Sequence, residues 1–388
     1  MNDLESTAHP ITFSPPRLLT SHSINIPVSM KLLVGTSKGL VVYHRVASSW
    51  KIEKAHFIGM PISMVYADPR TNTWWVGLAH RHWGQKLHHS QDEGRSWQAV
   101  PMPKYPAGAE YRPGKPAVLK KVWCMQQAGP RRPGGLWLGT EPGGLFYSAD
   151  NGRHFELVES LWNHPSRLDE NQWFGAGRDY PFIHSIVVDP RDENHVYIAV
   201  SCAGVFETKD GGKSWAPCNT GLVAAYLPNP NVEVGHDPHL LLACRAHPDV
   251  IWQQNHCGIF RTTNGGQNWD NVTDKNGLAD YGFALAIDEE DPDKAWVIPA
   301  VSDEMRVAPD LALCVCRTED GGRSWQALRR GLPQDHCFDI VFRHSLAKQH
   351  NVLAFGATTG NLFLSEDYGD SWSCVSSHLA RIDAVTFA

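Results

Sequence analysis

The chain has 388 residues, enough for two or three ordinary domains or for one large all-β domain. It is 42% hydrophobic and 20% charged, a balance that excludes an intrinsically disordered protein. The formal net charge is −6 and no Lys/Arg-rich block occurs, so we expect no nucleic-acid partner.

The first thirty residues differ from the rest of the chain. They contain Pro10, Pro15, Pro16 and Pro27 but no apolar run long enough for a signal peptide or a membrane helix. We predict that residues 1–30 form a disordered extension, that residues 31–388 form a single domain, and that the protein has no membrane partner. The nine cysteines are odd in number and scattered, which argues against a disulfide framework and favours a reducing cytoplasm.

Short strands are predicted from Lys31 to the end of the chain. Three strands at the N-terminus lack an inner neighbour, and the C-terminal segment Ile382–Phe387 supplies one, so pairing the two ends would close a ring. Between these ends, strands expected to line the centre of the ring recur at Ile62–Ala67, Val118–Met125, Ile183–Asp189, His239–Cys244, Tyr281–Ile287 and Cys337–Phe342.

One short pattern recurs through the chain: Ser/Thr, any residue, Asp/Asn, any residue, Gly, any residue, a polar residue, then an aromatic residue. The Asp or Asn can accept hydrogen bonds from backbone N–H groups in a tight turn, and the Gly permits a left-handed backbone. We therefore assign these carboxylates to turns rather than to catalysis. The copies are Ser90–Trp97, Ser148–Phe155, Thr208–Trp215, Thr262–Trp269, Thr318–Trp325 and Ser365–Trp372, and Gly39 with Trp50 keeps the frame of a seventh.

This pattern resembles the Asp-box, or BNR, repeat of sialidases and related propellers. The resemblance implies an all-β, seven-bladed β-propeller with Asp-box turns, closed by pairing of the C-terminal strand with the N-terminal blade. It extends to intracellular BNR proteins described as glycosyl hydrolase-like, through segments similar to Pro181–Ser185, Gly235–His239 and Gln254–Gly258. The Phe/Tyr-Arg-Ile-Pro motif of true sialidases is absent from this sequence.

Strand order predicts which face of the ring carries chemistry. If the repeat turns lie on the bottom face, then loops between second and third strands, and loops between blades, lie on the opposite face, here called the top face. Seven histidines are expected there. We predict a substrate-binding rim on this face, formed by His80, His82, Trp83, Glu141, Gln254, Asn255, Asp303 and His336.

The segments around His236 and His256 form the most informative cluster. His236 and His239 precede one inner strand, and His256 caps the adjacent hairpin of the same blade. Three imidazoles could hold Zn²⁺ or another divalent transition metal and activate water. Two further interpretations remain open: acid/base chemistry or binding without a metal, and a structural role in which the rings bond loop carbonyls.

Other polar residues of the top face are candidates for catalysis. Arg178 and Tyr180 precede His184 and could bind an anionic or sugar-like ligand, since an arginine presents a planar fork to a carboxylate. Arg306 lies in a long insertion, and Asp237 is well placed for acid/base work. The candidate catalytic residues are therefore His184, Asp237, Arg178, Tyr180 and Arg306.

Three functions follow from these patterns. The first is a cytoplasmic hydrolase or lyase that acts on a small polar organic substrate at a histidine-rich site on the top face, with or without a metal. The second is a non-catalytic propeller that binds a ligand or a protein partner, as the photosystem-assembly propellers do. The third is a sialidase-like glycoside hydrolase.

Overall fold

The computed structural model describes residues 30–388, except residues 48 and 176. The prediction of a disordered extension falls on residues 1–29, outside the described residues. Met30, which we had included in that extension, is instead buried, and its carbonyl accepts a hydrogen bond from the Arg45 N–H.

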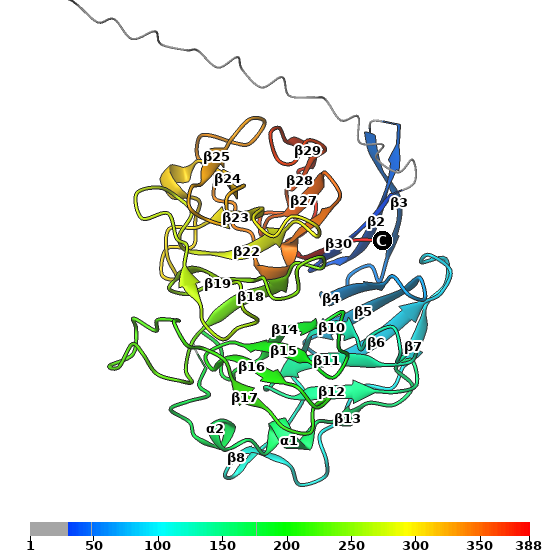
Figure 1. The fold of residues 1–388 in the computed structure, drawn as a ribbon. Coiled ribbons are helices and arrows are strands. Elements are labelled where there is room, and N and C mark those ends of the chain that lie inside the picture. The colour runs from blue at the N-terminus through cyan, green and yellow to red at the C-terminus, as the bar shows by residue number, and fades with distance from the viewer. Residues whose placement is uncertain (1–29, 48, 176) are drawn as a thin grey trace, which may run out of the picture.

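The described residues form seven four-stranded antiparallel sheets arranged as the blades of a propeller, which confirms the predicted fold. Each blade runs from an inner strand at the ring centre to an outer strand (Figure 1). From inner to outer, the second to fourth blades are β4 (Ile62–Asp68), β5 (Thr73–His80), β6 (Gly84–Ser90) and β7 (Gln98–Val100); β10 (Lys121–Gln127), β11 (Leu136–Glu141), β12 (Leu145–Ser148) and β13 (Glu156–Leu157); and β14 (Ile183–Val188), β15 (Val196–Val200), β16 (Gly204–Thr208) and β17 (Ala216–Pro217).

The remaining blades follow the same plan. They are β18 (Pro238–Ala243), β19 (Ile251–Asn255), β20 (Gly258–Thr262) and β21 (Asp270–Asn271); β22 (Gly282–Ile287), β23 (Ala295–Pro299), β24 (Val315–Thr318) and β25 (Gln326–Leu328); and β26 (Leu346–Gln349), β27 (Val352–Gly356), β28 (Leu362–Ser365) and β29 (Ser373–Ser376). The few other elements lie in connections: the two-stranded sheet β8 (Glu110–Arg112) and β9 (Lys115–Pro116), helices α1 (Glu159–Trp162) and α2 (Pro165–Leu168), and the 3₁₀ turns η1 (Pro309–Leu311) and η2 (Arg343–Ser345).

The first blade is built from both ends of the chain. The C-terminal strand β30 (Ile382–Phe387) pairs antiparallel with β1 (Lys31–Thr36), which is followed by β2 (Gly39–Val46) and β3 (Ser49–His56). Figure 1 shows the C-terminus beside the blue strands β2 and β3. The predicted closure of the ring is therefore confirmed.

The repeat turns share one hydrogen-bond pattern in all six copies. The Ser/Thr hydroxyl donates to the Asp/Asn Oδ1 at 2.7–2.9 Å and accepts from the Gly N–H at 2.8–3.1 Å. The same Oδ1 also accepts a hydrogen bond from the backbone N–H of the residue four positions after the Asp/Asn. In the fourth blade, for example, the Ser214 N–H donates to Asp210 Oδ1 at 2.9 Å. Gly212 has φ 91°, and a Cβ there would lie 3.1 Å from Trp137 of the neighbouring blade. These polar side chains therefore serve the turn.

A Thr208→Val variant should test this role. Thr208 is buried, and valine keeps its shape but leaves the Gly212 N–H without an acceptor. An unsatisfied buried donor costs about 1–3 kcal/mol, so we expect the free energy of unfolding in urea to fall by about that amount. Thr208→Ser, which keeps the hydroxyl, is the control. Equal stability of the valine variant and the wild type would contradict a structural role for the hydroxyl.

Two inner strands differ from the predicted bounds by more than one residue, and the other four differ by one residue at one or both ends. The third begins at Lys121 rather than Val118. The seventh was predicted at Cys337–Phe342, which is wrong: this segment has no regular structure, and the inner strand is β26 at Leu346–Gln349. The turn η2 lies between them and brings its first residue, Arg343, to the centre of the ring. Apolar Ile340 and Val341 are buried in the connection, which explains why the segment resembles a strand.

Candidate functional site

A cavity of about 380 Å³ lies at the centre of the ring, at the N-terminal ends of the inner strands. Exposed side chains, including Arg178, Arg306 and Arg381, stand at its mouth, so it opens to solvent on the top face. Every blade contributes to its wall, from the first to the seventh in the order Asp383, Ser63, Lys121, Phe182, His239, Phe283 and Arg343.

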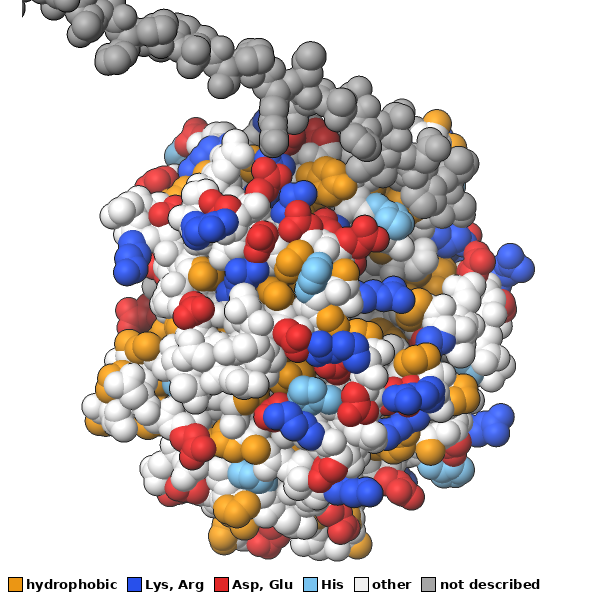
Figure 2. Space-filling model, in the orientation of Figure 1, with side chains coloured by type: hydrophobic (Ala, Val, Ile, Leu, Met, Phe, Trp, Pro, Cys, Tyr) orange, Lys and Arg blue, Asp and Glu red, His pale blue; other side chains and the backbone are white. Residues whose placement is uncertain are grey.

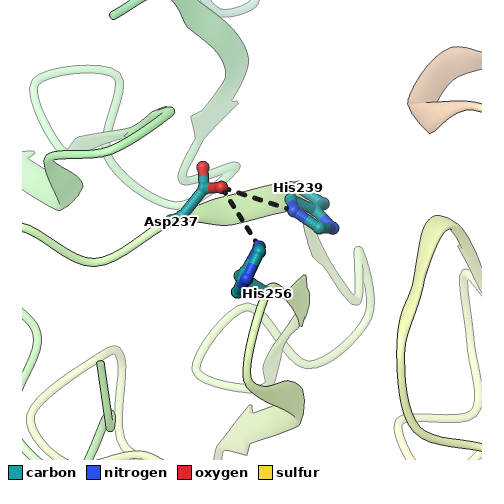
Figure 3. A group of neighbouring side chains, drawn as sticks. All are labelled: Asp237, His239 and His256. Carbon is teal, nitrogen blue, oxygen red and sulfur yellow. Dashed lines mark ion pairs between the residues drawn. The ribbon is translucent and has the colours of Figure 1, made fainter. Parts of the chain in front are cut away.

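Asp237, His239 and His256 form a compact group in one wall of this cavity (Figure 3). One carboxylate oxygen, Asp237 Oδ2, lies 3.5 Å from His239 Nε2 and 3.7 Å from His256 Nδ1. Asp237 directly precedes β18, and His239 is the second residue of that strand, where the pairing with β19 has a bulge; both side chains line the cavity. His256 reaches them from the turn between β19 and β20.

Asp237 is fixed by its other oxygen. Oδ1 accepts hydrogen bonds from Ser201 Oγ at 2.8 Å and from the Cys202 N–H at 3.1 Å. Burial acts to raise the pKa of Asp237, but the Arg343 charge and the Ser201 hydroxyl act to hold that pKa below its usual range. The carboxylate is therefore ionised at neutral pH and presents Oδ2 to the two imidazoles.

The two imidazoles are oriented by partners on their far sides. His239 Nδ1 lies 2.6 Å from the Gly282 carbonyl oxygen, which can only accept, so Nδ1 carries the proton and Nε2 presents a lone pair toward Asp237. Burial lowers the pKa of His239, which favours this neutral form. His256 points Nε2 toward Asp303 Oδ2 at 3.8 Å and Nδ1 toward Asp237. Tyr281 packs edge-on against both rings at 5.6 Å.

His236, predicted as a metal ligand, does not join this group. Its ring is buried and its Nε2 bonds the Val232 carbonyl oxygen at 2.8 Å. Because side chains alternate along the extended chain, His236 faces away from the side shared by Asp237 and His239. The structure places the Asp237 carboxylate where the third imidazole was expected.

The other predicted catalytic residues are divided between the cavity and its surroundings. Arg178 lines the cavity and pairs with the buried Glu141 at 2.7 Å, and Arg306 lines it while donating to the Asp303 carbonyl oxygen at 2.9 Å. His184 lies behind the wall, where it is completely buried and its ring nitrogens contact Ser185 Oγ and the Pro238 carbonyl oxygen.

Most of the predicted substrate-binding residues lie outside the cavity. Tyr180, predicted to be catalytic, packs edge-on against Tyr111 at 4.9 Å. Asp303 lines the cavity, whereas Glu141 lies behind it and bonds two lining residues, Arg178 and Trp123. Gln254 and Asn255 are fully buried and bond the Asp280 carbonyl oxygen and the Gln253 side chain. The residues that remain on the exterior rim are His80, His82, Trp83 and His336.

Sequence reasoning missed the cationic and aromatic part of the cavity. Lys121 lies 3.6 Å above the Trp123 ring, and that ring stacks on Phe182 at 4.1 Å. Burial lowers the pKa of Lys121 to about 8. Arg343 lies 5.2 Å from the Phe182 ring centre. These residues stand at the starts of the inner strands, a position that predicts exposure to the central channel. Because the bounds of the third and seventh inner strands were predicted wrongly, Lys121 and Arg343 were not recognised as residues at the starts of inner strands.

No protein-family model matches the chain. A curated relative, the oligoxyloglucan-reducing end-specific xyloglucanase of Emericella nidulans, is 22% identical over 271 residues, which cover 61% of this chain and 30% of that enzyme. The chain thus spans about a third of that relative's length.

The described helices include none with the length and apolar character needed to cross a bilayer.

Solved structures support the fold. An ancestral GH74 enzyme matches with a TM-score of 0.52 and 16% identity, covering 94% of this chain and 40% of that chain. YCF48 from Cyanidioschyzon merolae covers 93% of this chain and 96% of its own, with 15% identity and a TM-score of 0.47. This chain is similar in architecture to the β-propeller enzyme of the first comparison, and the likeness extends to the fold alone.

Proposed function

We propose that this propeller is a hydrolase or lyase that acts on a small polar organic substrate in the central cavity, with a divalent transition metal held by Asp237, His239 and His256. The observation that supports this most directly is the distance from Asp237 Oδ2 to the nearest nitrogen of each imidazole. The distances of 3.5 and 3.7 Å are too long for charge-assisted hydrogen bonds, which measure about 2.7–2.9 Å. Ligands that share one tetrahedral ion at bonds of about 2.0–2.2 Å are separated by about 3.4 Å.

The surroundings of the group support the same proposal. A carboxylate oxygen and the His239 Nε2 lone pair face each other, an arrangement of two acceptors that a cation between them would stabilise. The Gly282 carbonyl oxygen orients the remaining ring nitrogen of His239, as the second partner of a metal-bound histidine commonly does, and the Asp303 carboxylate lies 3.8 Å from that of His256. A metal with three protein ligands keeps a position for water and supplies a nucleophile at neutral pH.

Two features extend the proposal to the protein as a whole. The hydrogen bonds of the repeat turns support their assignment as Asp-box turns, and hence membership of the BNR propellers. All nine cysteines are free, which supports a reducing compartment such as the cytoplasm.

The xyloglucanase relative favours glycoside hydrolysis as a second candidate. That reaction usually needs two carboxyl groups, one of them a proton donor. Asp237 is held ionised, and Asp383 bonds Arg381 at 2.9 Å, so Asp303 is the remaining acid among the described residues that line the cavity. Hydrolysis of aryl glycosides that is lost in Asp303→Asn and retained in His239→Ala would favour this second candidate.

Metal analysis of the purified full chain tests the first candidate. We expect nearly one equivalent of zinc, manganese, iron or copper after equilibration with each metal and gel filtration, and less than a tenth of that amount in His239→Ala. His336→Ala, which removes an exposed histidine of the same face, is the matched control. Metal content that is negligible in the wild type, or equal in wild type and His239→Ala, would contradict the proposed centre.

A further inference from the structure

Arg343 is the only described arginine that is neither solvent-exposed nor engaged in a hydrogen bond or an ion pair. Its Nε is fully buried and has no partner. The guanidinium lies among the rings of Phe182, Phe283 and Trp123, with its central carbon 5.2, 5.4 and 5.9 Å from their centres. Aromatic faces attract a cation, but they do not accept its hydrogen bonds as an oxyanion does.

The cavity around Arg343 has an excess of positive charge. Its lining includes five basic side chains and three carboxylates, in a protein whose net charge is −6. Asp237 accepts hydrogen bonds from Ser201 and Cys202, and Asp383 pairs with Arg381, one of the five bases. On the exterior shown in Figure 2, basic and acidic side chains are interspersed. Of the five basic side chains, Arg178, Arg306 and Arg381 are exposed at the mouth, and Lys121 and Arg343 are less exposed.

Lys121 is the second cation without an anionic partner. It lies over the same Trp123 ring that Arg343 approaches, and the described residues give it neither an ion pair nor a side-chain hydrogen bond. The carboxylates whose charges act on these cations, Asp237 on Arg343 and Asp383 on Lys121, form no ion pair with them, and a bound anion would supply that contact. The stacked rings of Trp123 and Phe182 are buried beside both cations and provide no oxygen acceptor for them.

We propose that the substrate is a small organic anion whose carboxylate or phosphate group is bound by Arg343 and Lys121. This inference names the substrate class of the proposed function. Anion binding does not depend on that function, but the reaction of the bound anion does. Arg343 presents a fork that matches two oxygens of such a group, while Lys121 adds a point charge. The neighbouring Asp237, His239 and His256 then face the rest of the molecule.

Calorimetric titration of the full chain with matched probes tests the proposal. Benzoate carries a carboxylate on a flat ring, benzamide has the same shape without the charge, and inorganic phosphate carries the charge without the ring. We expect benzoate or phosphate to bind and benzamide to bind at least 10-fold more weakly. Benzoate binding would identify a carboxylate substrate, and tighter phosphate binding would identify a phosphorylated one. Failure of both anions to bind better than benzamide would overturn the proposal.

Variants of Arg343 separate binding from structure. Arg343→Met removes the charge while filling similar space, and we expect at least a 10-fold loss of anion affinity with an unchanged or higher melting temperature. Arg343→Lys should recover part of the affinity. Arg245→Met, which removes an exposed arginine outside the cavity, should bind as the wild type does. Lower melting temperatures with unchanged affinity in the Arg343 variants would assign Arg343 to structure and contradict the proposal.

The same titration in His239→Ala distinguishes this inference from the proposed metal centre. Anion binding that persists in a variant without metal would support the anion site. The metal centre would then be decided separately, by the metal analysis described above. Anion binding that requires metal in every variant, and is unaffected by Arg343→Met, would show that the metal alone binds the anion and would overturn the role of Arg343.

Discussion

An Asp237→Asn variant is expected to lose metal binding and any activity of the cavity while it retains the propeller. The asparagine carbonyl can still accept from Ser201 Oγ and the Cys202 N–H, which now bond Asp237 Oδ1. The amide nitrogen would then face His239 and His256 in place of Oδ2, and an amide nitrogen does not ligate a cation. Loss of an outer partner of a metal site costs about 10–100-fold in affinity, so loss of a direct ligand should cost on the order of 100-fold or more.

Asp237→Ala should behave differently from Asp237→Asn. The alanine leaves the Ser201 hydroxyl and the Cys202 N–H without an acceptor inside the protein, at about 1–3 kcal/mol for each group. We therefore expect the alanine variant to be clearly less stable in urea than the asparagine variant. Both should lack metal by elemental analysis. An asparagine variant that keeps the wild-type metal content and activity would contradict the role of the Oδ2 atom.

The asparagine variant should also change the pH dependence of stability. The native pKa of Asp237 is below its unfolded value, so its charge stabilises the fold at pH values above the unfolded pKa, and this stabilisation is lost as the pH falls through the native pKa. In Asp237→Asn this contribution is absent at every pH. The stability difference between wild type and variant should therefore be greatest near neutral pH and shrink toward acid pH.

The fold could be predicted because it is recorded in a repeated local signal. Each repeat turn needs its Ser/Thr, Asp/Asn and Gly at fixed positions, and the six copies, with the Gly39 and Trp50 frame of a seventh, predict the number and order of blades. Ring closure followed from counting strands at both ends. Blade seven was the exception, since the apolar segment Cys337–Phe342 satisfies a strand pattern although it lies in a connection. Burial alone, without pairing partners, does not distinguish these two cases.

The site was harder to predict because the direction of a side chain decides whether it reaches the cavity. His236 and His239 look equivalent in sequence, yet His236 bonds the Val232 carbonyl oxygen behind the wall, and His239, at a bulge of β18, lines the cavity. Gln254 and Asn255 were correctly placed near the top face, but their amides satisfy backbone and neighbouring groups. Arg343 was not predicted as a site residue. Its position at the channel depends on the short turn η2, and no repeated motif in the sequence predicts that turn.

Removal of residues 381–388 should abolish the cooperative unfolding of the whole ring. This truncation deletes β30, the inner strand of the first blade, and exposes the edge of β1 that it covers. Ile382 and Val385 are buried, and complete burial of each such side chain contributes about 1.5–3 kcal/mol. Together with the lost strand pairing, this approaches the total stability of about 5–15 kcal/mol that is usual for a folded domain.

Point variants at Ile382 provide a graded comparison with the truncation. Ile382 is completely buried against its neighbours, so Ile382→Val should cost about 0.5–1.5 kcal/mol and Ile382→Ala about 2–5 kcal/mol, with one cooperative transition retained in both. The truncated chain should instead show a broad transition or remain insoluble. Since β30 also brings Arg381 and Asp383 to the cavity, the anion affinity of any soluble truncated protein should fall as well. A truncated chain that melts like the wild type would show that the ring does not depend on this strand.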